Sequence, residues 1–533
     1  MASTGEQTRP RLSARNPATG AELGTVALTA PEDVAGVVAA VAKVQPLWAL
    51  LRVGDRARYM RRMAQAVIDD FDELADVLVA EQGRPRAEIA SLELLAAIDA
   101  LAWIADEGAG VLGSRGVRVS RSLSLAKRAR LAYEPYGVVA VIGAGSAPFA
   151  QPIGQIAGAL LAGNGVAFKP AARASLAGER IGRVLARAGL PAGLVRILHG
   201  GPETGIALAE SGVGKILFTG SPAVGRAVAR ACVSREKEVT VELGGKDAML
   251  VLADAHLPRA GAGALWAGCC AGAGQARGSI ERIYVVRERY EPFLAGLVRA
   301  APGLRVGDPA DERTQVGPLA SAARLARVQE LVEGAVAGGA TLHCGGPAEG
   351  PLAATGAFYA PTVLSGVAPD ARLEREPVDG PVLSVHAVDS EDEAIARANA
   401  GDYGLGASVW TADRYRGARI ARELHAGMVW LNDHLPGPTV SRGPWGAAAG
   451  GGLGRTLGEA GLRACAQEKL ITWDPPRTRG IWWSPYDATT VRAASAIARL
   501  RSQREADRER AWRAGLIPIA RLLARAFGRG VPQ

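Results

Sequence analysis

The feature that most constrains the fold of this chain is a run without charged residues, 137–168. The run is long enough to cross a membrane, yet it contains two prolines, two glutamines and an asparagine. Its apolar residues divide into a strand at 138–142, a helix at 153–162 and a second strand at 166–170. A strand-helix-strand unit that is buried on both faces also lacks charge. The run therefore predicts the centre of a parallel α/β sheet.

Strands and helices continue to alternate on the C-terminal side of this unit. Apolar strands are predicted at 194–198 and 215–219. A second set begins with a strand at 248–251, followed by a helix at 257–272 and a strand at 283–286. A chain of 533 residues is too long for one hydrophobic core. We therefore expect an α/β protein of two or three domains.

Charge and cysteine content exclude several classes of function. The formal net charge is +9, and residues 474–533 alone contribute +7 of it. The rest of the chain is close to neutral, which argues against a nucleic-acid partner. The five cysteines show neither C-x-x-C spacing nor partnering histidines, so no metal site and no disulfide framework is indicated. The first residues lack the apolar stretch of a secretory signal, and a cytoplasmic protein is expected.

Two motifs lie about thirty residues apart in the middle of the chain. The first is V-E-L-G-G-K-D at 241–247, and the second is A-G-A-G-Q-A-R-G at 271–278. Together they resemble the active-site core of the NAD(P)-dependent aldehyde dehydrogenase superfamily. An N-P-A-T-G opening at 16–20 and a T-G-S-P-A-V-G turn at 219–225 match the same family in order. The resemblance covers residues 15–473.

The resemblance implies an aldehyde dehydrogenase-like α/β fold with a Rossmann-type cofactor domain at 1–241, including a hairpin extension at about 113–134. A second, catalytic-type α/β domain would occupy 242–432. Residues 433–473 would return to the first domain and complete a small oligomerisation element, and 474–533 would form a basic, Arg-rich helical extension. The family also implies a homo-oligomer, a dimer or tetramer, with an aldehyde-like small molecule as its substrate.

The resemblance assigns catalytic roles to three positions, one of which carries an unexpected residue. Glu242 matches the general base. The nucleophilic Cys of the family stands three residues after the Gly of a G-Q-x-C loop, and here that position holds Arg277. An arginine cannot be the nucleophile because its guanidinium stays protonated. Ser146 stands where the family has an Asn that stabilises the oxyanion.

The resemblance also assigns a binding site for NAD or NADP. Lys169 would reach the adenosine ribose, and Gly220, Ser221 and Gly225 would form the turn that meets the pyrophosphate at a helix N-terminus. Gly244 would allow close approach of the ligand to the backbone. The two acids that hold the ribose hydroxyls in the family are replaced by Ala172 and Pro377.

These observations leave three hypotheses. The leading one is a degenerate family member that keeps dinucleotide binding and does not oxidise aldehydes through a thiol. The second is an active NAD(P)-dependent oxidoreductase with another nucleophile, such as Cys269, Cys270 or Ser279. The third is a scaffolding subunit that partners an active homologue.

The C-terminal extension has two interpretations of its own. Trp482, Trp483 and Tyr486 precede an Arg-rich helical pattern at 491–514. Such a segment is typical of peripheral contact with an anionic membrane. It also suits a helix that packs on the body of the protein, or on a partner subunit, with its Arg face solvated.

Overall fold

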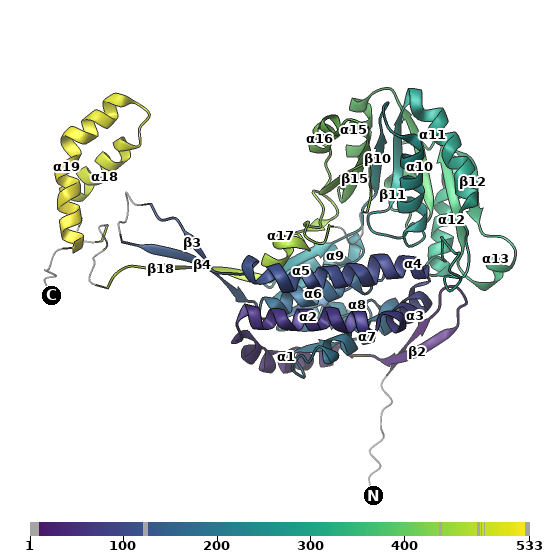
Figure 1. The fold of residues 1–533 in the computed structure, drawn as a ribbon, viewed down its shortest axis with the longest axis horizontal. Coiled ribbons are helices and arrows are strands. Elements are labelled where there is room, and N and C mark those ends of the chain that lie inside the picture. Colours follow the sequence, from purple (N-terminus) through teal and green to yellow (C-terminus); the bar gives the residue numbers. More distant parts are fainter. Residues whose placement is uncertain are drawn as a thin grey trace, which may run out of the picture. The chain divides into compact units, whose positions relative to one another are not determined.

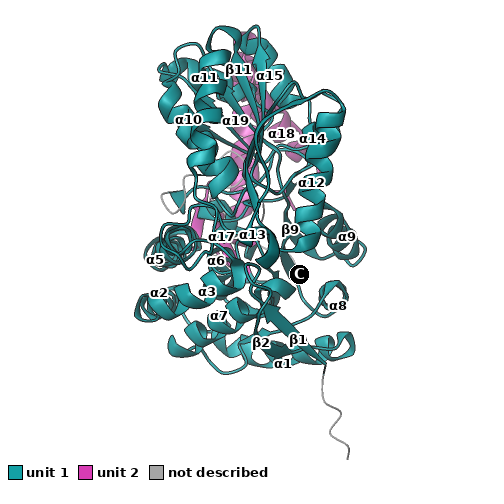
Figure 2. Ribbon diagram, turned by 90° about the vertical axis from the view of Figure 1, so that its right-hand side faces the viewer, with its two compact units in different colours: residues 1–112, 135–467 teal, residues 113–134, 468–533 magenta. Residues whose placement is uncertain are grey.

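The strands predicted around the uncharged run lie side by side in the computed structural model, which describes residues 10–120, 126–435, 440–476, 480, 482–483 and 486–527. The chain divides into two compact units (Figure 2). The first unit consists of residues 1–112 and 135–467 and holds two large sheets. The second consists of residues 113–134 and 468–533.

The first large sheet has six strands in the described part of the chain, in the order β17-β9-β8-β5-β6-β7. All neighbours are parallel except β17, which runs antiparallel to β9. The strands are β17 (Gly452–Leu453), β9 (Glu238–Glu242), β8 (Lys215–Thr219), β5 (Val138–Ile142), β6 (Gly165–Lys169) and β7 (Val195–Ile197). The uncharged run thus forms the middle of a parallel sheet, as predicted.

Helices cover the first sheet, and its central strands β5, β6 and β8 are therefore buried along their whole length. Val138, Ala140 and Ile142 of β5 pack in one cluster with side chains of α1 (Val34–Ala49), α8 (Pro202–Glu210) and α9 (Pro222–Val233). The helix of the uncharged run, α6 (Ala150–Leu161), packs on β5 and β6 and on α5 (Ala96–Val111) and α2 (Val53–Asp69). The other elements of this region are β1 (Arg11–Arg15), β2 (Glu22–Ala27), η1 (Pro31–Asp33), α3 (Phe71–Gln82), α4 (Arg86–Glu88), the π-helix η2 (Ile89–Leu95), η3 (Ala172–Ala174) and α7 (Ser175–Arg187).

The second large sheet has seven strands among the described residues, in the order β12-β13-β14-β11-β10-β15-β16. Only β12 is antiparallel to its neighbour. The strands are β12 (Thr341–Pro347), β13 (Tyr359–Ser365), β14 (Val382–Val388), β11 (Ile280–Val286), β10 (Asp247–Val251), β15 (Gly406–Trp410) and β16 (Met428–Leu431). The α/β fold with two sheets confirms the fold class expected from the sequence.

Successive residues of β10 point to opposite faces of the second sheet. Met249 and Val251 pack with α10 (Leu257–Leu265) and α11 (Arg287–Ala300), which lie beside β10 and β11 (Figure 1). Ala248 and Leu250 pack with α15 (Glu391–Asn399) and α16 (Arg414–Glu423). The remaining helices are the π-helix η4 (Trp266–Cys270), η5 (Ala301–Gly303), α12 (Ala322–Ala337), α13 (Pro351–Thr355), α14 (Arg372–Arg375) and α17 (Gly458–Arg463).

The second unit holds a small sheet and two helices. The sheet has the order β18-β4-β3, with β3 (Arg115–Val117) antiparallel to β4 (Arg128–Pro135) and with β18 (Ala466–Trp473) on the other side of β4. This is the predicted hairpin, whose residues 121–125 lie outside the described residues. The helices α18 (Ala488–Leu500) and α19 (Glu505–Phe527) pack on each other.

We searched the described helices for a membrane span. No single one is both long and apolar enough to cross a bilayer. The consecutive stretches Pro31–Ala49 and Val53–Asp69 meet the criteria of length and composition together, with a bend of 117° between them.

Candidate active-site cavity

A cavity of about 640 Å³ opens at the carboxyl ends of the parallel strands of the first sheet. Ligands of open α/β sheets bind at this edge, and the volume suits a small molecule or cofactor. Loops of the second sheet close the cavity from the other side through Gln275, Arg277, Pro377 and Asp379. Most of the site residues predicted from the sequence therefore surround one space: Ser146, Lys169, Gly220, Ser221, Gly244 and Arg277 all line it.

Glu242 is the last residue of β9 and is buried, with 3% of its side chain exposed. Its Oε2 accepts a hydrogen bond of 2.8 Å from Gln151 Nε2 and an ion-pair contact from Arg277 Nη1. Its Oε1 accepts one from Gln155 Nε2 at 3.4 Å and one from the hydroxyl of Thr456. A carboxylate offers about four lone-pair positions, so those of Glu242 are filled.

Arg277 lies in the loop between η4 and β11, in a turn that the sequence alone did not predict. The helix expected at 257–272 ends at Cys270, and its last turn is the π-helix η4. Ala273 then adopts a positive φ of 54°, and a Cβ on Gly274 would lie 2.1 Å from Gly380 O. The tight approach of two loops, rather than helix propensity, fixes this turn.

Arg277 makes further contacts besides its ion pair with Glu242. Its Cζ lies 6.0 Å from the centre of the Trp445 ring, within the range of a cation–π contact. Its backbone oxygen accepts a hydrogen bond of 3.2 Å from Gly245 N. With 13% of its side chain exposed, Arg277 occupies the wall of the cavity beside the Glu242 carboxylate.

The other nucleophiles considered from the sequence are poorly placed for catalysis. Cys269 is buried, and burial raises its thiol pKa well above the ordinary value. Burial, with a smaller contribution from the Glu88 carboxylate, raises the pKa of Cys270 to about 12, so its thiolate is rare at neutral pH. The buried Ser279 hydroxyl donates a hydrogen bond of 2.7 Å to Ala267 O.

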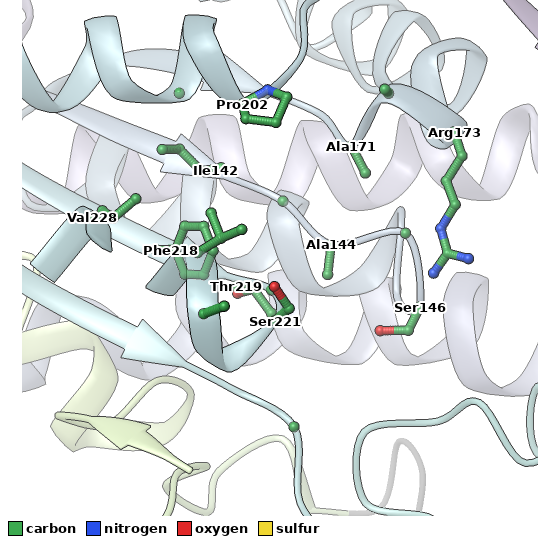
Figure 3. Close-up of a pocket in the computed structure, with 18 of the residues that line it drawn as sticks. Ile142, Ala144, Ser146, Ala171, Arg173, Pro202, Phe218, Thr219, Ser221 and Val228 are labelled. Carbon is green, nitrogen blue, oxygen red and sulfur yellow. The ribbon is translucent and has the colours of Figure 1, made fainter. Parts of the chain in front are cut away.

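Ser146 lies in the turn between β5 and α6, and an arginine crosses the cavity next to it. Arg173, in η3, reaches toward this turn (Figure 3). A Cβ on Gly145 would lie 2.1 Å from Arg173 Nε, so the arginine fills the space that any larger residue at 145 would need. Arg84 Nη1 also donates a hydrogen bond of 3.4 Å to Ser146 O. Ser146 therefore shares its end of the cavity with a guanidinium.

The N-terminus of α9 forms the opposite wall. Ser221 is its N-cap residue, yet within the described residues its side chain makes no capping hydrogen bond. Figure 3 shows Ser221 and Thr219 in the middle of the cavity, between Arg173 and Val228. Gly225 lies inside α9, where a Cβ would meet Leu243 Cδ2 at 2.3 Å, so it serves the close packing of helix and strand. A Cβ on Gly244 would meet nothing within 4 Å, so this backbone faces open space.

Lys169 ends β6 and is buried at the edge of the same cavity. Its Nζ donates a hydrogen bond of 3.3 Å to Pro170 O. Burial lowers the pKa of Lys169 to about 8, although the Glu203 carboxylate partly offsets this effect. The ammonium is therefore charged at neutral pH but close to titration.

These residues fit the phosphate half of a dinucleotide better than its nicotinamide half. An uncapped helix N-terminus, a bare glycine backbone and a lysine are suited to bind phosphate oxygens. At the other end Pro377 carries no hydrogen-bonding side chain, and the Asp379 carboxylate is paired with Arg324. Four basic side chains line the cavity against one acid, which favours an anionic ligand: Lys169, Arg173, Arg277 and Arg324 against Asp379.

Sequence reasoning did not identify the partners of Glu242. Gln151 and Gln155 are one turn apart on α6, and two glutamines at that spacing in an otherwise apolar helix are the signal that could have shown them. Thr456, the third partner, is about two hundred residues away in sequence, and it forms a β-bridge with Trp445, the residue that contacts Arg277. No local pattern marks such partners.

Comparison with known proteins identifies the family of this fold. The model of the aldehyde dehydrogenase family matches residues 4–471. A betaine aldehyde dehydrogenase of Cereibacter sphaeroides is 36% identical over 456 residues, which are 85% of this chain and 92% of the relative.

Solved structures of the same family superpose on most of the chain. A Mycobacterium tuberculosis aldehyde dehydrogenase complexed with NAD+ has a TM-score of 0.83 and 32% identity, over 87% of this chain and 95% of that one. An NAD-dependent aldehyde dehydrogenase from Sinorhizobium meliloti has a TM-score of 0.83 and 30% identity, over 89% and 93% of the two chains. Since the family model and the relatives cover nearly the whole fold, this chain belongs to the aldehyde dehydrogenase family.

Proposed function

We propose that this protein is an aldehyde dehydrogenase family member that binds NAD or NADP but does not oxidise aldehydes through a covalent thiol intermediate. The observation that carries the proposal is the saturation of Glu242, whose two carboxylate oxygens accept four contacts, one of them from Arg277. A general base needs a free lone pair toward the water that it activates. Glu242 has none, and the residue at the nucleophile position is a cation.

The proposed ligand is held mainly through its phosphates. The N-terminus of α9, with Ser221 and Gly220, would bind the pyrophosphate, and Gly244 would leave room for it. Lys169 would donate to a ribose hydroxyl or phosphate. Because Ala172 replaces the family's acid, the carboxylate that would repel a 2′-phosphate from that position is missing, so NAD and NADP are both accepted. The nicotinamide would supply a hydride acceptor, but Arg277 cannot add to the aldehyde carbonyl to form the covalent adduct from which the substrate would release its hydride.

Family members are typically homo-oligomers, and we propose a dimer or tetramer for this chain as well. The antiparallel β3–β4 hairpin and β18 form the sheet that would carry the assembly. Sedimentation velocity of the full chain measures the state directly, and a monomer at micromolar concentration would refute this part of the proposal.

The test compares the natural protein with Arg277→Cys and, as a matched control, Arg277→Ser. Dinucleotide binding is measured by calorimetry, and NADH and NADPH formation is followed over a panel of aldehydes. We expect all three proteins to bind dinucleotide, the natural protein and the serine variant to be inactive, and the cysteine variant to gain activity. Arg277→Cys supplies a thiol and frees one lone pair on Oε2 of Glu242, whereas Arg277→Ser frees the same lone pair without a thiol.

Three outcomes separate the alternatives. Turnover by the natural protein would overturn the proposal and favour an oxidoreductase with another nucleophile. Binding without turnover in every variant would support the loss of oxidation and place a further defect at Ser146 or Pro377. Absence of dinucleotide binding would refute the proposal that this protein binds NAD or NADP. A scaffolding subunit would then explain the result better.

A further inference from the structure

The helix α19 exposes apolar side chains that the helix packed against it, α18, does not cover. Its other face is already buried against α18, through Ala511, Gly515, Leu522 and Ala526. The packing is close, because a Cβ on Gly515 would lie 2.2 Å from Ala496 Cβ. The apolar side chains on the rest of α19 therefore cannot be buried between the two helices.

Three large apolar side chains remain exposed on α19. Trp512 is 59%, Leu516 54% and Ile517 66% exposed. Trp512 and Leu516 are four residues apart and share one face of the helix, and Ile517 follows about 100° further round, within about 8 Å of Trp512 along the axis at 1.5 Å per residue. We call these three residues the α19 patch. Large apolar side chains exposed together on neighbouring turns mark an interaction surface.

Arginines predominate around the α19 patch. From Arg510 to Phe527 the helix contains four arginines and no acid, and the acid Glu509 stands just before this stretch, one turn before Trp512. Arg510 and Arg521 make no ion pair within the described residues, and Arg513 only approaches Glu509 at 3.9 Å. Arg525 is tied to Asp487 at the start of α18, which brings the exposed Tyr486 to the same end of the hairpin.

We propose that α19 binds the surface of an anionic lipid bilayer through the α19 patch, with Arg510, Arg513 and Arg521 on the headgroups. A stretch with four arginines and no acid suits the negative surface potential of anionic lipids. Here long cationic side chains border the patch, and such side chains can extend to the headgroup level while their stems stay in the apolar layer. Trp and Leu inserted to the acyl boundary, beside arginines, form the usual composition of a helix that lies on a membrane.

The first test is flotation of the full chain with vesicles of phosphatidylcholine and phosphatidylserine, compared with vesicles of phosphatidylcholine alone. We expect the protein to float with the anionic vesicles, and to be released as the salt concentration rises, because the charges are screened. The double variant Arg510→Gln/Arg513→Gln should bind about 30-fold more weakly, since each arginine near the surface contributes about a fivefold factor.

The second test separates the patch from the charge. Leu516→Gln/Ile517→Gln should lower binding at least about tenfold, because two apolar side chains lose their burial in the bilayer. The matched control is Leu47→Gln/Leu50→Gln, a more exposed pair at the C-terminal end of α1, which should bind like the natural chain. Circular dichroism confirms that each variant is folded.

Several results would overturn the proposal. The natural chain could stay in the lower fractions with anionic vesicles, or bind phosphatidylcholine equally at any salt concentration. The patch variants could bind as well as the control pair. If Leu516→Gln/Ile517→Gln instead converts an oligomer to a smaller species in sedimentation velocity without lipid, the patch contacts a second copy of the chain and not a membrane.

Discussion

At one end of the cavity the Glu242 carboxylate accepts four contacts from side chains, whereas at the other end the Ser221 hydroxyl makes no capping bond and Gly244 faces open space. The first end has its polar groups satisfied within the chain. The second leaves a helix N-terminus and a buried lysine without a strong partner. Polar groups that are satisfied internally stabilise a fold, and those that are not remain available to a ligand. The difference separates a part of the family site that has become structural from a part that still suits binding.

The largest effect is expected from a substitution at the end of the cavity that holds Glu242, which we call the saturated end. Arg277→Ala leaves the buried Glu242 carboxylate without its cation, which should lower the free energy of unfolding by about 3 kcal/mol. Arg324→Ala removes an arginine from the Arg324–Asp379 pair, whose side chains are 33% and 39% exposed. That loss should cost less than about 1 kcal/mol because solvent screens the pair. Urea titration of both variants measures the difference, and equal losses would show that the Glu242 pair is not structural.

A smaller effect is expected at the end of the cavity that holds Ser221 and Gly244, which we call the open end. A substitution there should change ligand binding and not stability. Gly244→Val places a side chain in the cavity without meeting any atom within 4 Å of its Cβ. Dinucleotide affinity should fall about tenfold, the equivalent of 1.4 kcal/mol, with unfolding unchanged. Gly212→Val, in the loop before β8, is the control because its Cβ also meets nothing within 4 Å. A loss of affinity in both variants, or in neither, would contradict a binding role for Gly244.

The two ends also differ in how well the sequence predicted them. The open end is built from consecutive strand, turn and helix, and Gly220, Ser221 and Lys169 were named from the sequence by their resemblance to the motifs of the family. The saturated end depends on contacts between distant segments. Glu242 and Arg277 were identified by their motifs, but their ion pair, the π-helix before Arg277 and the hydroxyl of Thr456 come from tertiary packing. Local periodicity contains no information on such contacts.

The C-terminal extension illustrates the same limit. The sequence predicts an Arg-rich helical pattern at 491–514 and a short apolar one with arginines at 516–527, whereas the structure ends α18 at Leu500 and begins α19 at Glu505. The sequence could not show which face of α19 packs on α18, because that face consists mainly of small residues such as Gly515 and Ala511, with Leu522 beside them.

The smallest effect concerns the pH dependence of the open end, and its sign differs between binding and stability. The pKa of Lys169 is about 8, lowered mainly by burial, so the ammonium loses its charge as the pH rises through 8. Binding of an anionic ligand should therefore weaken several-fold from about pH 7 to about pH 9, with a midpoint slightly above 8 because the bound anion favours the charged form.

In the unfolded chain the lysine keeps a pKa of about 10.4, so between 8 and 10.4 the unfolded state binds more protons. The contribution of Lys169 to the free energy of unfolding then rises with pH in this window and is lost as the pH falls through 8. Lys169→Met should bind more weakly at neutral pH and show neither dependence. If calorimetry finds the same pH profile in the natural chain and in Lys169→Met, Lys169 does not contact the ligand, and the open end binds through α9 alone.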